Sequence, residues 1–176
     1  VMFNLSDVAV VGQFADYRAL GAVGSTTILV TLFTGFLIGM GSGVNVQVAL
    51  GLGAKDDKTV EKTIHTAFLI CAAIGIMIGV FCILFARPML QALHTKSDLI
   101  DAAVLYLKIY ALGMPAMAVY NFGNGVLSAK GDTKSPLIYL AVAGVLNIIL
   151  NLIFVIGFHL AAAGVAIASA IAQYVS

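Results

Sequence analysis

The chain has 176 residues, of which 61% are hydrophobic and 10% are charged, and its formal net charge is +1. Soluble domains average roughly 25% charged residues, so this composition excludes a soluble domain and makes the lipid bilayer the expected partner. With a charge this close to zero and no run of basic residues, the chain offers no electrostatic field for nucleic acid.

Apolar stretches follow one another along the chain and are separated by short polar connections. A helix needs about 20 residues to cross a bilayer. The sequence therefore predicts spanning helices at about 27–52, 64–86, 101–128 and 135–158, with partial helices at 1–15 and 161–176. The predicted fold is one all-α domain over residues 1–176, a polytopic membrane helix bundle. Because the chain opens with Val1 and closes inside an apolar run, we expect it to be part of a longer protein.

The first apolar stretch contains a carboxylate, Asp7, and this residue most strongly predicts function. An ionisable group at membrane depth is costly unless it faces a partner or a wet cavity, and such groups mark ion or substrate pathways. The alternative is that Asp7, protonated or capped by amides, only holds two helices together.

Glycines recur at helical intervals in the second and third stretches, at Gly35, Gly39 and Gly43 and again at Gly75 and Gly79. Small residues with this spacing let helix backbones approach one another closely. We therefore expect these glycines to lie at helix–helix contacts.

Polar side chains also gather toward the inner ends of the second and fourth stretches. Neighbouring residues on a helix point in different directions, so only some of them can face one cavity. The candidate cavity-lining residues are Asn45, Gln47, Tyr120, Asn121 and Asn124.

The fourth stretch is interrupted by Gly113-Met114-Pro115. Pro115 has no N–H to donate to the carbonyl of Ala111, and its ring crowds that turn. We expect a kink here, with Gly113 and Pro115 as hinge residues, because broken helices recur where transporters flex or bind.

The fifth stretch carries Asn147 and Asn151, which are four residues apart and so lie on one helical face. Counting about 1.5 Å per residue from the outer ends of the spans places both amides at the depth of Asp7. The three side chains suit a site that alternates between a cation and a proton. Amides are also ordinary contacts between membrane helices, and this alternative stays open.

The basic residues predict an orientation. The second and fourth connections carry Lys55, Lys58, Lys62, Lys130 and Lys134, whereas the other connections carry Arg18, Arg87 and Lys96. By the positive-inside rule, connections two and four face the cytoplasm.

Cys71 and Cys82 lie about three turns apart on one predicted helix, which is too far for a disulfide. The histidines are scattered singly without ligand spacing, so we predict no metal site and no cofactor.

Several short segments together resemble one family. They are NLSD at 4–7, LGAVG at 20–24, GLGAKD at 51–56, KGDTKSP at 130–136, NIILN at 147–151 and GVAIA at 164–168. In order and spacing these segments are similar to those of multidrug and toxic compound extrusion (MATE) transporters. The resemblance implies that the chain is most of one six-helix lobe of a two-lobe MATE-type transporter, without its second lobe.

The family resemblance also implies a function. Such proteins are multi-pass transporters of the plasma or bacterial inner membrane that exchange H⁺ or Na⁺ for small cationic or amphipathic substrates, by alternating access of the two lobes. Asp7 matches the first-helix acid of ion coupling, and Asn147 belongs to the same network. Many relatives carry Asp where this chain has Asn151, which cannot take up a proton. Ser169 falls near a hydroxyl position of the sixth helix.

Three other functions remain as alternatives. A lipid-linked oligosaccharide flippase of the same superfamily would favour several basic residues facing the cavity, whereas Lys108 is the basic residue inside a predicted span. An enzyme is not expected, since no metalloprotease or phosphate-binding motif occurs. The chain could also be a fragment that transports nothing.

Overall fold

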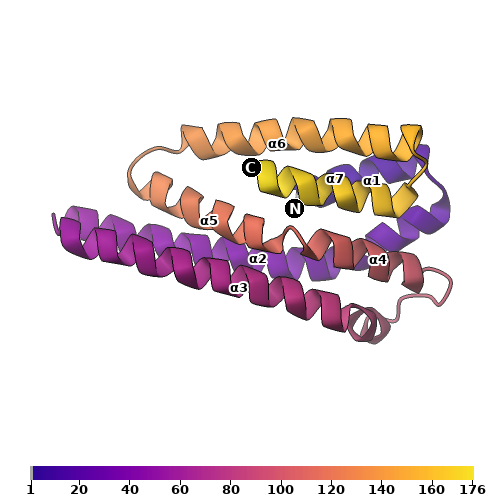
Figure 1. The fold of residues 1–176 in the computed structure, drawn as a ribbon, viewed down its shortest axis with the longest axis horizontal. Helices are drawn as coiled ribbons and strands as arrows, with labels where there is room; N and C mark the ends of the chain where they lie inside the picture. The colour runs from indigo at the N-terminus through magenta and orange to yellow at the C-terminus, as the bar shows by residue number, and fades with distance from the viewer. Residues whose placement is uncertain (1) are drawn as a thin grey trace.

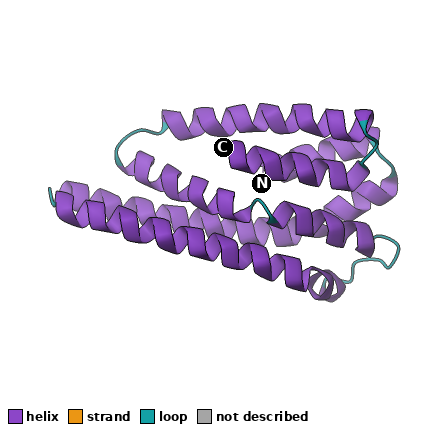
Figure 2. Ribbon diagram, in the orientation of Figure 1, coloured by secondary structure: helices purple, strands orange, loops and turns teal. Residues whose placement is uncertain are grey.

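The computed structural model describes residues 2–176, so Val1, at which the predicted first helix begins, lies outside the described residues. Among the described residues there are helices and connections but no strand (Figure 2). The helices are α1 (Met2–Phe14), α2 (Tyr17–Gly53), α3 (Asp57–Ala92), α4 (Ile100–Ala111), α5 (Met114–Ala129), α6 (Lys134–Leu152), the π-helix η1 (Ile153–Gly157) and α7 (Ala161–Val175). The predicted all-α fold is confirmed.

Helix α2 begins ten residues before the predicted start at residue 27, at Tyr17. Asp16 caps it, since its carboxylate accepts a hydrogen bond of 2.9 Å from the N–H of Ala19. The polar side chains before residue 27 are satisfied inside the helix, since the hydroxyls of Ser25 and Thr26 donate to carbonyls of their own helix.

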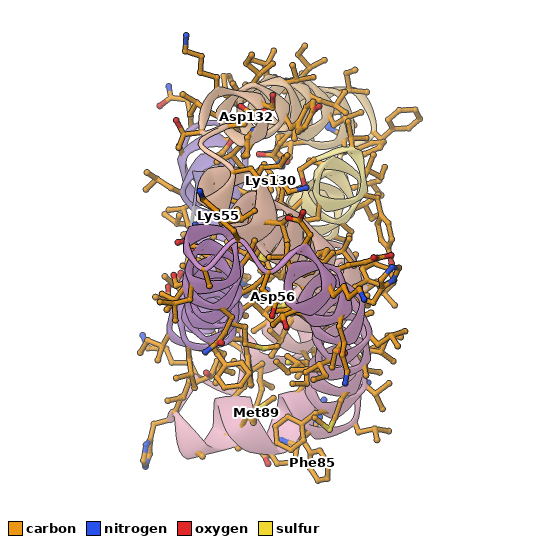
Figure 3. The ribbon with its side chains drawn as sticks, turned by 90° about the vertical axis from the view of Figure 1, so that its left-hand side faces the viewer. Lys55, Asp56, Phe85, Met89, Lys130 and Asp132 are labelled. Atoms are coloured by element: carbon orange, nitrogen blue, oxygen red, sulfur yellow. The ribbon has the colours of Figure 1, made fainter. Side chains whose placement is uncertain are left out.

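Helix α3 is also longer than the predicted 64–86, because its polar first turns are helical as well. The carboxylate of Asp56 accepts from the hydroxyl and the N–H of Thr59, at 2.6 and 3.1 Å. Both bonds lower the pKa of Asp56, and the bond from the Thr59 hydroxyl contributes more than the bond from the Thr59 N–H. At the other end the helix contains Pro88, and its last turns, which carry Met89, run across the bundle (Figure 1, Figure 3).

The predicted helix 101–128 consists of two helices, α4 and α5, which are bent by 46° at a short break. Gly113 and Pro115 lie at this bend. The glycines of α3 pack against it: a Cβ added to Gly75 would lie 3.0 Å from the Cα of Pro115, and one added to Gly79 would lie 3.0 Å from the carbonyl oxygen of Ala111. The third stretch therefore uses its glycines to accommodate the break in the fourth.

The glycine pattern of the second stretch was interpreted wrongly. Gly35, Gly39 and Gly43 face open space within the described residues. The close contact is made instead by Gly41, whose Cα lies against the carbonyl of Asn121 on α5, and by Gly125 of α5, which lies against the carbonyl of Gly41. Spacing alone does not say which face of a helix meets a partner.

The predicted helix 135–158 is α6 continued by the π-helical turn η1, and α7 follows after a short connection. Helix α7 packs against α4 and α6, and α1 packs against α2, α6 and α7, so α1 and α7 lie between α6 and the group of α2 to α5 (Figure 1). This central position of α1 and α7 places Asp7 inside the bundle.

The connections lie at two opposite ends. Those between α2 and α3 and between α5 and α6 share one end (Figure 1), where Lys55, Asp56, Lys130 and Asp132 are seen together in Figure 3. By length and composition, α2, α3 and α6 with η1 can each cross a membrane, and the bent pair α4–α5 forms a fourth candidate span. Large apolar side chains cover the outer faces, among them Ile28, Leu32, Phe36, Leu69, Leu84, Leu137 and Val145. The chain is therefore a multi-pass membrane helix bundle.

Candidate functional site

The centre of the candidate site is the carboxylate of Asp7 on α1, which is 0% exposed. Three neutral donors surround it. The hydroxyl of Tyr106 on α4 donates at 2.8 Å, the amide of Asn151 on α6 donates at 2.9 Å, and the hydroxyl of Ser169 on α7 lies 2.9 and 2.7 Å from the two carboxylate oxygens. One side chain thus connects α1, α4, α6 and α7.

A second group of side chains orients these donors. Asn147 donates to the hydroxyl oxygen of Ser169 at 3.0 Å, which leaves the proton of that hydroxyl for Asp7. Its carbonyl oxygen lies 3.4 Å from the amide nitrogen of Asn151. On the other side, Asn4 donates to the Tyr106 hydroxyl at 3.2 Å. The structure therefore brings together Asp7, Asn147 and Asn151, which the sequence groups at one depth. Ser169, which was predicted only as a possible cavity-lining residue, joins them and lines neither of the cavities described below.

The sequence did not indicate Tyr106 or Asn4. A tyrosine near the end of a predicted span suits an anchor at the membrane interface. Tyr106 and Tyr110 are instead fully buried, and their rings stack with centroids 5.8 Å apart. Asn4 belongs to the NLSD segment that resembles the family, which gives it no role of its own. Its position three residues before Asp7, on the same face of α1, is the signal that could have identified it.

The predicted cavity-lining residues divide into two groups. Asn121 and Asn124 line a cavity of about 290 Å³ together with Tyr120, and a second of about 260 Å³ together with Asn45. Gln47 is exposed and lines neither cavity. Asp7 does not line them either, but Phe3, one turn earlier on α1, lines the larger one.

The hinge residues are held by α7. The hydroxyl of Tyr174 donates to the carbonyl of Leu112 at 2.9 Å. The side chain of Gln173 packs so closely on Gly113 that an added Cβ would overlap its amide. The bend is therefore filled by α7, the helix that also supplies Ser169.

Among residues 2–176 no three His, Cys, Asp or Glu side chains gather where they could hold a metal ion. Cys71 and Cys82 are both buried and unpaired with each other.

Comparison with known proteins gives one consistent result. The family model described as MatE matches residues 1–153. The probable multidrug resistance protein YpnP of Bacillus subtilis is 28% identical over 98% of this chain, and the FAD transporter of Shewanella oneidensis is 24% identical over 88%. The crystal structure of MATE in the bent conformation superposes with a TM-score of 0.94 at 22% identity, over 99% of this chain and 39% of that one. The chain spans 39% and 34% of the length of the two curated relatives.

Proposed function

Because this chain belongs to the MatE family, we propose that it is most of one lobe of a secondary active transporter. The transporter exports small cationic or amphipathic compounds in exchange for H⁺ or Na⁺, by alternating access of two lobes. The exchange is coupled at Asp7. Support for the cargo class comes from the relative YpnP, whose name is that of a multidrug resistance protein.

The observation that carries the proposal is a buried carboxylate with neutral partners. Asp7 forms no salt bridge among the described residues, where the ion pairs are Arg87–Asp101 and the contact between His65 and Glu61. A buried negative charge without a cation is costly, and a proton or a metal cation removes that cost. The side chains around Asp7 therefore favour uptake of one positive charge.

The same site contains oxygens for either ion. The carboxylate oxygens of Asp7, the carbonyl oxygen of Asn147 and the hydroxyl oxygen of Ser169 are hard ligands of the kind that alkali and alkaline-earth cations prefer. The carbonyl oxygen of Asn151 is buried and has no hydrogen-bond partner among the described residues, so it is also free to accept a hydrogen bond or to coordinate a cation.

Uptake of a proton at Asp7 would change the hydrogen bonds between helices. All three neighbours now donate to the carboxylate, but a protonated carboxyl is itself a donor and needs an acceptor. One neighbour must then turn or withdraw. Because those neighbours are on α4, α6 and α7, the protonation state of Asp7 changes how α1 packs on these helices, and α4 leads directly into the bend.

The cavities favour neutral or cationic cargo over polyanionic cargo. No Lys or Arg is among the described residues that line the cavities beside Asn121 and Asn124. A lipid-linked oligosaccharide or a dinucleotide such as FAD carries phosphates, which Arg and Lys side chains would normally bind. The described lobe therefore gives no support to the flippase alternative, and the FAD transporter among the relatives does not decide the cargo of this chain.

The test is the variant Asp7→Asn in the full-length protein, assayed by efflux of a cationic amphipathic dye from proteoliposomes with an imposed H⁺ or Na⁺ gradient. We expect loss of gradient-driven efflux with normal membrane insertion, because the amide cannot bind the coupling ion. Asp98→Asn, at an exposed position, is the matched control and should retain efflux. Wild-type coupled efflux in Asp7→Asn would refute the assignment.

A further inference from the structure

A second group of buried polar side chains lies beside the Asp7 network and takes no part in it. It consists of Thr34 on α2, Tyr110 on α4 and Gln173 on α7, which are 3%, 0% and 2% exposed. The hydroxyls of Thr34 and Tyr110 and both polar atoms of Gln173 have no hydrogen-bond partner in the described chain. Both Thr34 and Gln173 are nevertheless close to the Tyr110 hydroxyl.

In the described geometry, the contacts within the chain leave these polar atoms without a well-formed hydrogen bond. Buried polar groups in folded proteins are nearly always hydrogen-bonded, and an unpaired group forfeits its hydration without compensation. The three side chains come from three different helices, so they meet only when the bundle is packed.

The group has access to water. Thr34 and Gln173 line the cavity of about 290 Å³ that Asn121 and Asn124 also line. A water molecule takes about 30 Å³ in the liquid and is held in proteins by two to four polar partners, so this cavity has both the space and the partners. The described residues that line it include no charged side chain, so they offer neutral hydrogen-bond donors and acceptors.

We propose that Thr34, Tyr110 and Gln173 form a hydration site, separate from Asp7, that holds bound water against the inner wall of this cavity. Tyr110 donates to or accepts from the water by its hydroxyl, and the amide of Gln173 supplies both a donor and an acceptor. The ring of Tyr110 stacks on that of Tyr106, whose hydroxyl donates to Asp7. Water from the cavity thereby reaches the aromatic ring next to the ion site.

The experiment is radiolytic hydroxyl-radical labelling of the full-length protein in ¹⁸O water, read by mass spectrometry. Radicals formed from a bound water label the side chain beside it. Tyr110 and Tyr106 are a matched pair, both 0% exposed on one helix, but the hydroxyl of Tyr106 is occupied by Asn4 and Asp7. We expect Tyr110 to be labelled several-fold faster than Tyr106.

The variant Thr34→Val/Gln173→Leu should reduce labelling of Tyr110 to the level of Tyr106, while exposed His65 is labelled as before. Thr34→Ser keeps the hydroxyl and should keep the label. Equal labelling of the two tyrosines in the wild type, or an unchanged Tyr110 signal in the double variant, would overturn the proposal. Labelling requires no transport, so this outcome is independent of the proposed ion exchange.

Discussion

Replacing Gly41 by Ala tests the closest contact between α2 and α5. A Cβ at this position would overlap the backbone carbonyl of Asn121, and rotation of a side chain cannot relieve that overlap. The two helices would have to separate, which would also strain the reciprocal contact of Gly125 with the Gly41 carbonyl and the 3.1 Å hydrogen bond from Asn45 to the Gly125 carbonyl. Overpacking of a tight core costs about 1–3 kcal/mol.

Gly43→Ala is the matched control, because a Cβ there meets nothing within 4 Å. Both substitutions gain helix propensity, roughly 0.8–1.0 kcal/mol in favour of Ala. The difference between the two variants therefore isolates the overlap, and we expect Gly41→Ala to be less stable than Gly43→Ala by about 1–3 kcal/mol.

The assay is unfolding of the detergent-solubilised full-length protein, by heat or by denaturing detergent, with both variants measured beside the wild type. The sequence pattern alone predicts the opposite order, because Gly43 belongs to the regular glycine repeat with Gly35 and Gly39 and Gly41 does not. If Gly43→Ala proved to be the less stable variant, or if the two were equal, the packing of α2 on α5 described above would be wrong.

Two further variants test the proposed ion site at Asp7 and the bend between α4 and α5. Asn151→Asp places a second carboxyl where the amide now lies 2.9 Å from Asp7, so we expect the pH dependence of efflux to change and a second proton or a cation to be taken up. The measurement is the number of protons released per dye molecule exported, as a function of pH. An unchanged pH profile would contradict a coupling role for Asn151. Pro115→Ala restores the missing N–H at the bend, and we expect slower exchange between the two access states, followed by a distance probe across the lobes, with little change in yield. A loss of yield alone would make Pro115 purely structural.

The fold and part of the site could be predicted because the membrane makes polar residues conspicuous. Asp7 and the pair Asn147 and Asn151 stand out in apolar stretches, and a four-residue spacing fixes a common face. The side chains from other helices that contact Asp7 were harder to predict. Tyr106 was missed because a phenol near the end of a span also suits the lipid interface, and sequence gives no sign of which side of the helix is buried.

The helix boundaries show a similar limit. The span was predicted to begin only at residue 27, although Asp16 is a typical capping residue and the hydroxyls of Ser25 and Thr26 bond within α2. Composition alone cannot distinguish a polar loop from the polar end of a long helix. The family match, by contrast, was predicted from segments along the chain and is confirmed by the MatE model over residues 1–153.

Helix α7 contacts both the Asp7 carboxylate and the bend between α4 and α5, from neighbouring turns. Ser169 contacts Asp7, while Gln173 and Tyr174, about one turn further along, contact Gly113 and Leu112. A helical turn is stiff and only about 5.4 Å long, so these contacts move as one piece. A displacement of Ser169 from the carboxylate would therefore also displace Gln173 and Tyr174 from the joint between α4 and α5, so α7 links the two places through one stiff turn.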